Sequence, residues 1–63
     1  MKRTREQLMN AAQRRVAAAR RALEAASCEK QIGLRTIYFA NAIYDLARAD
    51  AYFDEAEKME DNR

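Results

Sequence analysis

Small residues recur at seven-residue intervals through the middle of this chain. They are Ala12, Ala19, Ala26, Gly33, Ala40 and Ala47. Between them, also seven apart, lie Met9, Val16, Leu23, Lys30, Ile37 and Tyr44. This alternation of three-residue and four-residue steps is typical of the heptad seam between two packed α-helices. Small side chains let two helix backbones approach closely, so we expect the five alanines to be packed in a tight contact between helices.

The length of the chain limits how much it can bury on its own. Its 63 residues form one domain at most, and a chain of this size buries only about 60% of its unfolded surface. Cys28 is the single cysteine and histidine is absent, so an intrachain disulfide and a structural zinc site are excluded. Oligomerisation is the remaining way to complete a core, and we expect a homodimer without metal or cofactor.

Local signals divide the chain into two helices. Thr4 and Gln7 have the spacing of a capping box, proline is absent, and alanine supplies 14 residues. Gly33 is the only glycine and suits the residue just past a helix end. The sequence therefore predicts an all-α antiparallel hairpin over residues 1–63. Its helices are expected at about 4–32 and 35–59, with a turn near Gly33 and dimerisation into a four-helix bundle.

A second architecture explains the small-residue repeat equally directly. The repeat keeps its phase through Gly33, although a turn there would free the second helix to change it. One continuous helix, paired antiparallel with a second chain, would preserve that phase. We favour the hairpin because glycine inside a helix costs about 1 kcal/mol.

Charge is divided unevenly between the two halves of the chain. Residues 1–30 carry eight basic and three acidic side chains, whereas residues 31–63 carry four basic and seven acidic ones. Antiparallel packing brings the basic start beside the acidic end. In the expected register Asp50 lies near Arg15, so we predict an ion pair that offsets the cost of a partly buried carboxylate.

The second helix is expected to be apolar on more than one side, which is typical of a helix covered by several neighbours. One row contains Leu34, Tyr38, Tyr52 and Met59. Tyrosine is enriched in binding hot spots and methionine adapts to varied partners. We therefore interpret this row as a docking surface for a partner protein, with burial in the homodimer as the alternative.

The first helix carries an arginine stripe on its outer face, formed by Arg14, Arg15 and Arg21. Such a stripe can follow the phosphates of a nucleic acid. It can equally be a solvated surface whose arginines pair with the acidic second helix. The stripe contains no aromatic side chain to contact bases, which favours the second interpretation.

The plan resembles that of the Rop family of plasmid copy-number regulators. The resemblance lies in the chain length and in an alanine-bearing heptad seam within two helices of similar length, with Asn10 on the outer face of the first helix. It implies an RNA-binding dimer of helical hairpins. The aromatic residue expected on the RNA-binding face is missing here, since Arg14 and Ala17 occupy that face.

No motif of a catalytic site is present in the sequence. It has no glycine-rich loop, no nucleophile with a histidine and no metal constellation. No signal peptide or membrane span is evident either, and the lone thiol suits a reducing compartment. We therefore expect a cytoplasmic, non-enzymatic adaptor or regulatory protein that homodimerises and binds a partner protein. The alternative is an RNA- or DNA-binding helical dimer that uses the arginine stripe.

Overall fold

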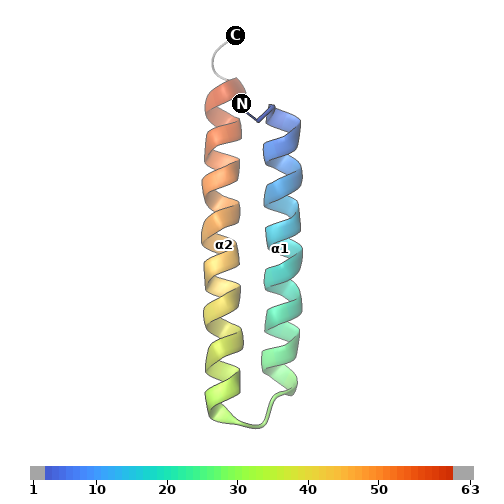
Figure 1. Ribbon diagram of the computed structural model, residues 1–63, viewed down its shortest axis with the longest axis vertical. Coiled ribbons are helices and arrows are strands. Elements are labelled where there is room, and N and C mark those ends of the chain that lie inside the picture. The colour runs from blue at the N-terminus through green and yellow to red at the C-terminus, as the bar shows by residue number, and fades with distance from the viewer. Residues whose placement is uncertain (1–2, 61–63) are drawn as a thin grey trace.

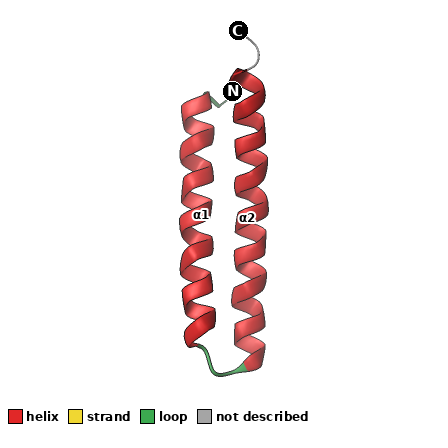
Figure 2. Ribbon diagram, turned by 180° about the vertical axis from the view of Figure 1, so that it is seen from behind, coloured by secondary structure: helices red, strands yellow, loops and turns green. Residues whose placement is uncertain are grey.

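The chain is a hairpin of two long antiparallel helices (Figure 1). The computed structural model describes residues 3–60, of which α1 covers Arg5–Cys28 and α2 covers Ile32–Glu60. The hairpin measures 50 × 19 × 13 Å, so it is a narrow slab two helices wide and one helix thick. Only a short connection separates the helices in the view from behind (Figure 2). The predicted all-α hairpin is confirmed, and the continuous-helix alternative is wrong for this chain.

A capping box fixes the start of α1, as the sequence predicts. The backbone N–H of Gln7 donates to Thr4 Oγ1 at 3.1 Å, and the backbone N–H of Thr4 donates to Gln7 Oε1 at 2.9 Å. Two amides without partners in the helix are thereby satisfied. Leu8, one residue further on, is 1% exposed, so the cap also orients the first core side chain.

The turn between the helices lies earlier than the sequence predicts. α1 ends at Cys28 and α2 begins at Ile32, leaving residues 29–31 as the connection. The side chain of Glu29 accepts a hydrogen bond from the backbone N–H of Gln31 at 3.0 Å, which places a carboxylate at the positive end of α2. Gly33 lies in the first turn of α2 with an ordinary negative φ. The turn predicted near Gly33 therefore lies just before it, and Gly33 belongs to α2 instead of ending α1.

The contact between the helices is made almost entirely of alanine. In the described part of the chain, the buried apolar residues are Leu8 and six alanines, namely Ala12, Ala19, Ala26, Ala42, Ala49 and Ala56. Each buried methyl group contributes only about 0.8 kcal/mol. The contact is thus close but carries little hydrophobic driving force, because its only large buried side chain is Leu8.

The seam follows the predicted phase in α1 but changes phase in α2. Ala12, Ala19 and Ala26 are buried as expected, whereas Ala40 and Ala47 are exposed. Within the hairpin, their predicted place in the seam is wrong. The turn at 29–31 resets the rotation of α2, so that the alanines two positions further along face α1 instead.

Candidate functional site

The hairpin has two broad faces, one on each side of the alanine seam. The residues that flank the seam are polar on one face and apolar on the other. In antiparallel helices, equivalent flanking rows of the two helices lie on the same side of the contact. One such side carries Arg15 and Asp45, and the other carries Val16 and Phe53. We call these sides the polar face and the apolar face.

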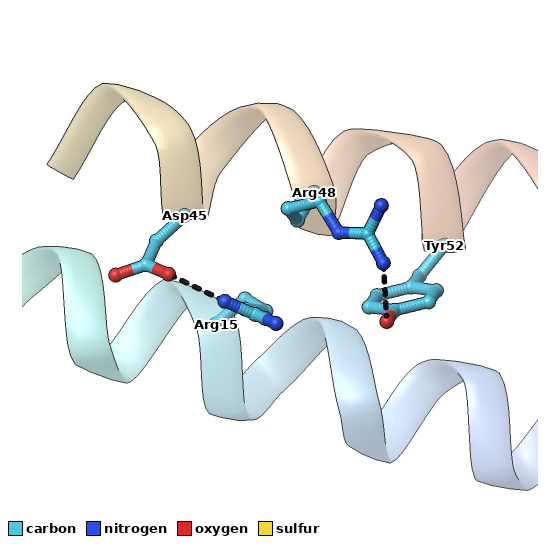
Figure 3. A network of polar contacts seen from close by, with 4 residues as sticks. All are labelled: Arg15, Asp45, Arg48 and Tyr52. Atoms are coloured by element: carbon cyan, nitrogen blue, oxygen red, sulfur yellow. Dashed lines mark hydrogen bonds and ion pairs between the residues drawn. The ribbon is translucent and has the colours of Figure 1, made fainter. Parts of the chain in front are cut away.

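An ion pair joins the two helices on the polar face. Arg15 Nη1 donates to Asp45 Oδ1 at 2.9 Å (Figure 3). The guanidinium of Arg15 also lies 5.7 Å from the centre of the Tyr44 ring. The hydrogen bond to Asp45 raises the pKa of Arg15. Asp50, which the sequence places beside Arg15, is exposed instead. The predicted pair is therefore wrong, and Asp45, five residues earlier in α2, takes the place of Asp50.

Two arginines surround Tyr52 on the same face. Arg48 Nη2 donates to the Tyr52 hydroxyl at 3.2 Å (Figure 3), and its guanidinium lies 5.4 Å from the ring centre. The guanidinium of Arg3 lies 5.1 Å from the same ring centre. Hydrogen bonding by Arg3 and then by Arg48 lowers the pKa of Tyr52, because both arginines favour the phenolate. The ring therefore belongs to a polar network that links the start of the chain to α2.

The apolar face is formed by one row of large side chains from each helix. At heptad spacing these are Met9, Val16 and Leu23 in α1 and Phe39, Leu46 and Phe53 in α2. Leu46 is 45% exposed and Phe39 41%, while Val16 is half-buried. The face contains no charged residue at these six positions. The face therefore carries a row of large apolar side chains from each helix.

A shallow groove lies on the apolar face. It has a volume of about 270 Å³ and is lined by Gln13, Val16, Ala17, Arg20 and Phe53. An empty apolar cavity of roughly 150 Å³ is enough to hold benzene. The groove can therefore accept a large aliphatic or aromatic side chain from outside the hairpin.

A further side of α2, outside the alanine seam, is also apolar, and the ring of its Tyr44 lies 5.7 Å from the guanidinium of Arg15 in α1. We call it the outer row; it contains Ile37, Ala40, Tyr44, Ala47 and Ala51. Ile37 is 54% exposed and Tyr44 59%. The exposed hydrophobic residues of α2 indicate an interaction surface, since large apolar patches on a protein surface are commonly interfaces.

The predicted partner-binding row of Leu34, Tyr38, Tyr52 and Met59 lies on the side of α2 that packs against α1. Ala42, Ala49 and Ala56 belong to the same side of α2 and are buried against α1. The two tyrosines are half-buried, and only the outlying Leu34 and Met59 are exposed, at 39% and 37%. The tyrosines therefore flank the contact with α1, and docking of a partner on this row stays a prediction.

The predicted arginine stripe is divided by the fold. Arg14 and Arg21 are exposed and form no ion pair with any other described residue. Arg15 is bound to Asp45 and turned toward α2. Sequence spacing could not show this, because Arg14 and Arg15 are adjacent and only the rotation of the helix decides which one faces inward.

The described residues, 3–60, hold one cysteine, Cys28, and no histidine. Within that range, no group of three or more His, Cys, Asp or Glu side chains is placed to hold a metal ion. Neither helix there combines the length and apolarity that a membrane crossing needs. The thiol of Cys28 is exposed at the end of α1, and the nearby hydroxyl of Ser27 lies 3.9 Å from its sulfur.

Comparison with known proteins gave no relative: no protein-family model, no curated protein and no solved structure matches this chain.

Proposed function

We propose that this chain is a small non-enzymatic adaptor or regulatory protein that acts through contacts with other proteins. It works as a homodimer of hairpins, arranged as a four-helix bundle, and binds a partner protein through the helix surface that the dimer leaves exposed. The outer row of α2 supplies that surface. Binding alters the activity or the assembly of the partner.

One observation carries the proposal: most of the large apolar side chains are outside the core. Among the described residues, ten large hydrophobic side chains are exposed, and nine of them belong to α2. A helix that is apolar nearly all round is normally covered by several neighbours. α1 covers only one side of α2, so the remaining sides have the character of binding surfaces.

Capture of a partner by the immobilised protein tests this function. The native chain should retain the same protein from a nuclease-treated lysate in repeated trials. A variant with Ile37→Ser and Tyr44→Ser should lose that protein while remaining helical by circular dichroism. Asn41→Ser, an exposed change elsewhere on α2, is the matched control and should leave capture intact. Equal capture by all three chains would contradict a role for the outer row.

Nucleic-acid binding is the second candidate, and it is favoured because Arg14 and Arg21 form no ion pair with another described residue. A protein that neutralises phosphates releases counterions, so its affinity falls steeply as salt rises. Titration with duplex DNA and with hairpin RNA at two salt concentrations tests this function. We expect weak binding that Arg14→Glu with Arg21→Glu does not change. Tight, salt-dependent binding that this variant abolishes would replace the adaptor function.

A further inference from the structure

We propose that the occupant of the apolar face is a second copy of this chain, packed so that α1 of each copy lies beside α2 of the other. The inference rests on the proposed homodimer and assigns its interface. Met9, Val16, Leu23, Phe39, Leu46 and Phe53 form that interface.

The size of the face fits a second copy. The broad side of the hairpin measures 50 × 19 Å, and each partner in a standard protein interface buries about 800 Å². The apolar row of each helix runs along this side, with the alanine seam between the rows as a low floor. A second slab of the same dimensions covers the whole face, whereas a single helix from another protein covers only the floor between the rows.

A second copy would also bury large apolar side chains that the single hairpin leaves exposed. Its own contact buries only Leu8 and alanine side chains in the described residues. Packing two apolar faces together removes three large side chains of α1 and three of α2 from water in each copy. Full burial of such a side chain contributes about 1.5–3 kcal/mol. The second copy therefore supplies the hydrophobic core that each hairpin lacks.

Charge decides how the two copies are oriented. α1 contains five arginines and two glutamates, whereas α2 contains three basic and six acidic residues. If the two-fold axis runs along the length of the hairpin, each basic α1 lies next to the acidic α2 of the other copy. If the axis runs across the hairpin, the two basic helices become neighbours and so do the two acidic ones. Complementary potentials favour the first arrangement.

The groove fits this orientation. A two-fold axis along the hairpin leaves the position of each residue along that axis unchanged. The hydrogen bond between Arg15 and Asp45 shows that these two residues lie at the same position along the axis. Leu46, next to Asp45, is thereby brought opposite the part of α1 that lines the groove, at Gln13 and Val16. We infer that Leu46 of each copy enters the groove of the other.

Photo-cross-linking at matched aromatic positions tests the interface. Replacing Phe39 or Phe53 with p-benzoyl-phenylalanine changes the apolar face, and replacing Tyr44 places the same group on the outer row of the same helix. All three sites are at least 37% exposed, so the bulky group is tolerated. On irradiation, we expect a covalent two-chain product from positions 39 and 53 but not from position 44. Peptide mapping of that product should join α2 of one copy to α1 of the other.

Other outcomes overturn the inference at different points. If position 44 alone, or all three positions, gave two-chain products, the dimer would be held by a surface other than the apolar face. The proposed homodimer would then be retained, but its assigned interface would be wrong. Links from α2 to α2 would contradict the orientation. Absence of any two-chain product, together with a monomeric mass in solution, would remove the homodimer from the proposed function as well.

Discussion

The two broad faces of this hairpin flank the same alanine seam, but only one of them has its side chains paired within the chain. On the polar face, Arg15 and Arg48 reach partners within the chain, Asp45 and Tyr52. On the apolar face, Phe39, Leu46 and Phe53 remain exposed because they flank the contact between the helices instead of pointing into it. The polar face is complete in one copy, whereas the apolar face is incomplete. The hairpin contact therefore satisfies the polar face and leaves the apolar face exposed, which is the face that the proposed second copy would cover.

Introducing a charge on the apolar face should have the largest effect. Leu46→Glu would place an unpaired carboxylate in the proposed interface, and loss of a central interface anchor costs about 2 kcal/mol or more. We expect dimerisation to weaken at least about thirty-fold in sedimentation equilibrium. Asn41→Glu introduces the same side chain elsewhere on α2 and should leave the dimer intact. If both variants weakened dimerisation to a similar extent, the apolar face would have no special role in the dimer.

Enlarging a seam alanine should have the next largest effect. Ala49 is 2% exposed, so Ala49→Leu should force the helices apart and cost about 1–3 kcal/mol of unfolding free energy. Ala47→Leu, two residues away on the outer row, should be nearly neutral. Urea unfolding measures both. If Ala47→Leu proved the more damaging change, the rotation of α2 would be wrong, and with it the assignment of both faces.

The turn that sets this rotation can be tested at Gly33. A Cβ atom there would meet nothing within 4 Å, and the glycine has no positive φ. Gly33→Ala should therefore stabilise the fold by about 0.4–1 kcal/mol, because alanine restricts the unfolded chain. A raised urea midpoint would support a turn at 29–31. A lowered midpoint would return Gly33 to the turn and shift the phase of both faces.

On the polar face, the cross-helix ion pair should give a smaller effect. A double-mutant cycle between Arg15→Ala and Asp45→Ala should show a favourable interaction that weakens as salt rises. The same cycle with Asp50→Ala in place of Asp45→Ala should show additivity, since Asp50 is exposed away from Arg15. Coupling to Asp50 instead of Asp45 would contradict the register of the helices.

The smallest effect concerns the titration of Tyr52. Its pKa is lowered from 10.0 in the folded chain, so folding favours the phenolate and the resulting stabilisation is complete only above the unfolded pKa. The stability difference between the native chain and Tyr52→Phe should therefore widen as pH rises from neutral toward 10. Thermal melting across this range measures it. A constant difference would show that Arg3 and Arg48 do not act on the hydroxyl.

Much of the fold follows from the sequence, whereas the faces of α2 do not. The capping box at Thr4 and Gln7 and the seam of Ala12, Ala19 and Ala26 are set by local spacing, and the structure confirms them. α2 has small residues at two sets of heptad positions, one through Ala40 and another through Ala42. Hydropathy cannot choose between them, because both sets are flanked by large apolar side chains.

The choice depends on the length of the connection, and this explains the remaining errors. Glycine suggests a turn at Gly33, but the hydrogen bond from Gln31 to Glu29 and the start of α2 at Ile32 set the rotation instead. That rotation turns Tyr38 and Tyr52 toward α1. It also pairs Arg15 with Asp45. The half-buried position of the two tyrosines and the change of ion-pair partner therefore have the same origin as the displaced turn.

Sedimentation equilibrium of the native chain at micromolar concentration tests the central claim most directly, namely that one hairpin is incomplete and a second copy covers its apolar face. The claim predicts a single species of twice the 7.3 kDa chain mass. It also predicts an unfolding temperature that rises with protein concentration, as mass action requires for a dimer. A folded 7.3 kDa species whose melting temperature is the same at every concentration would contradict it.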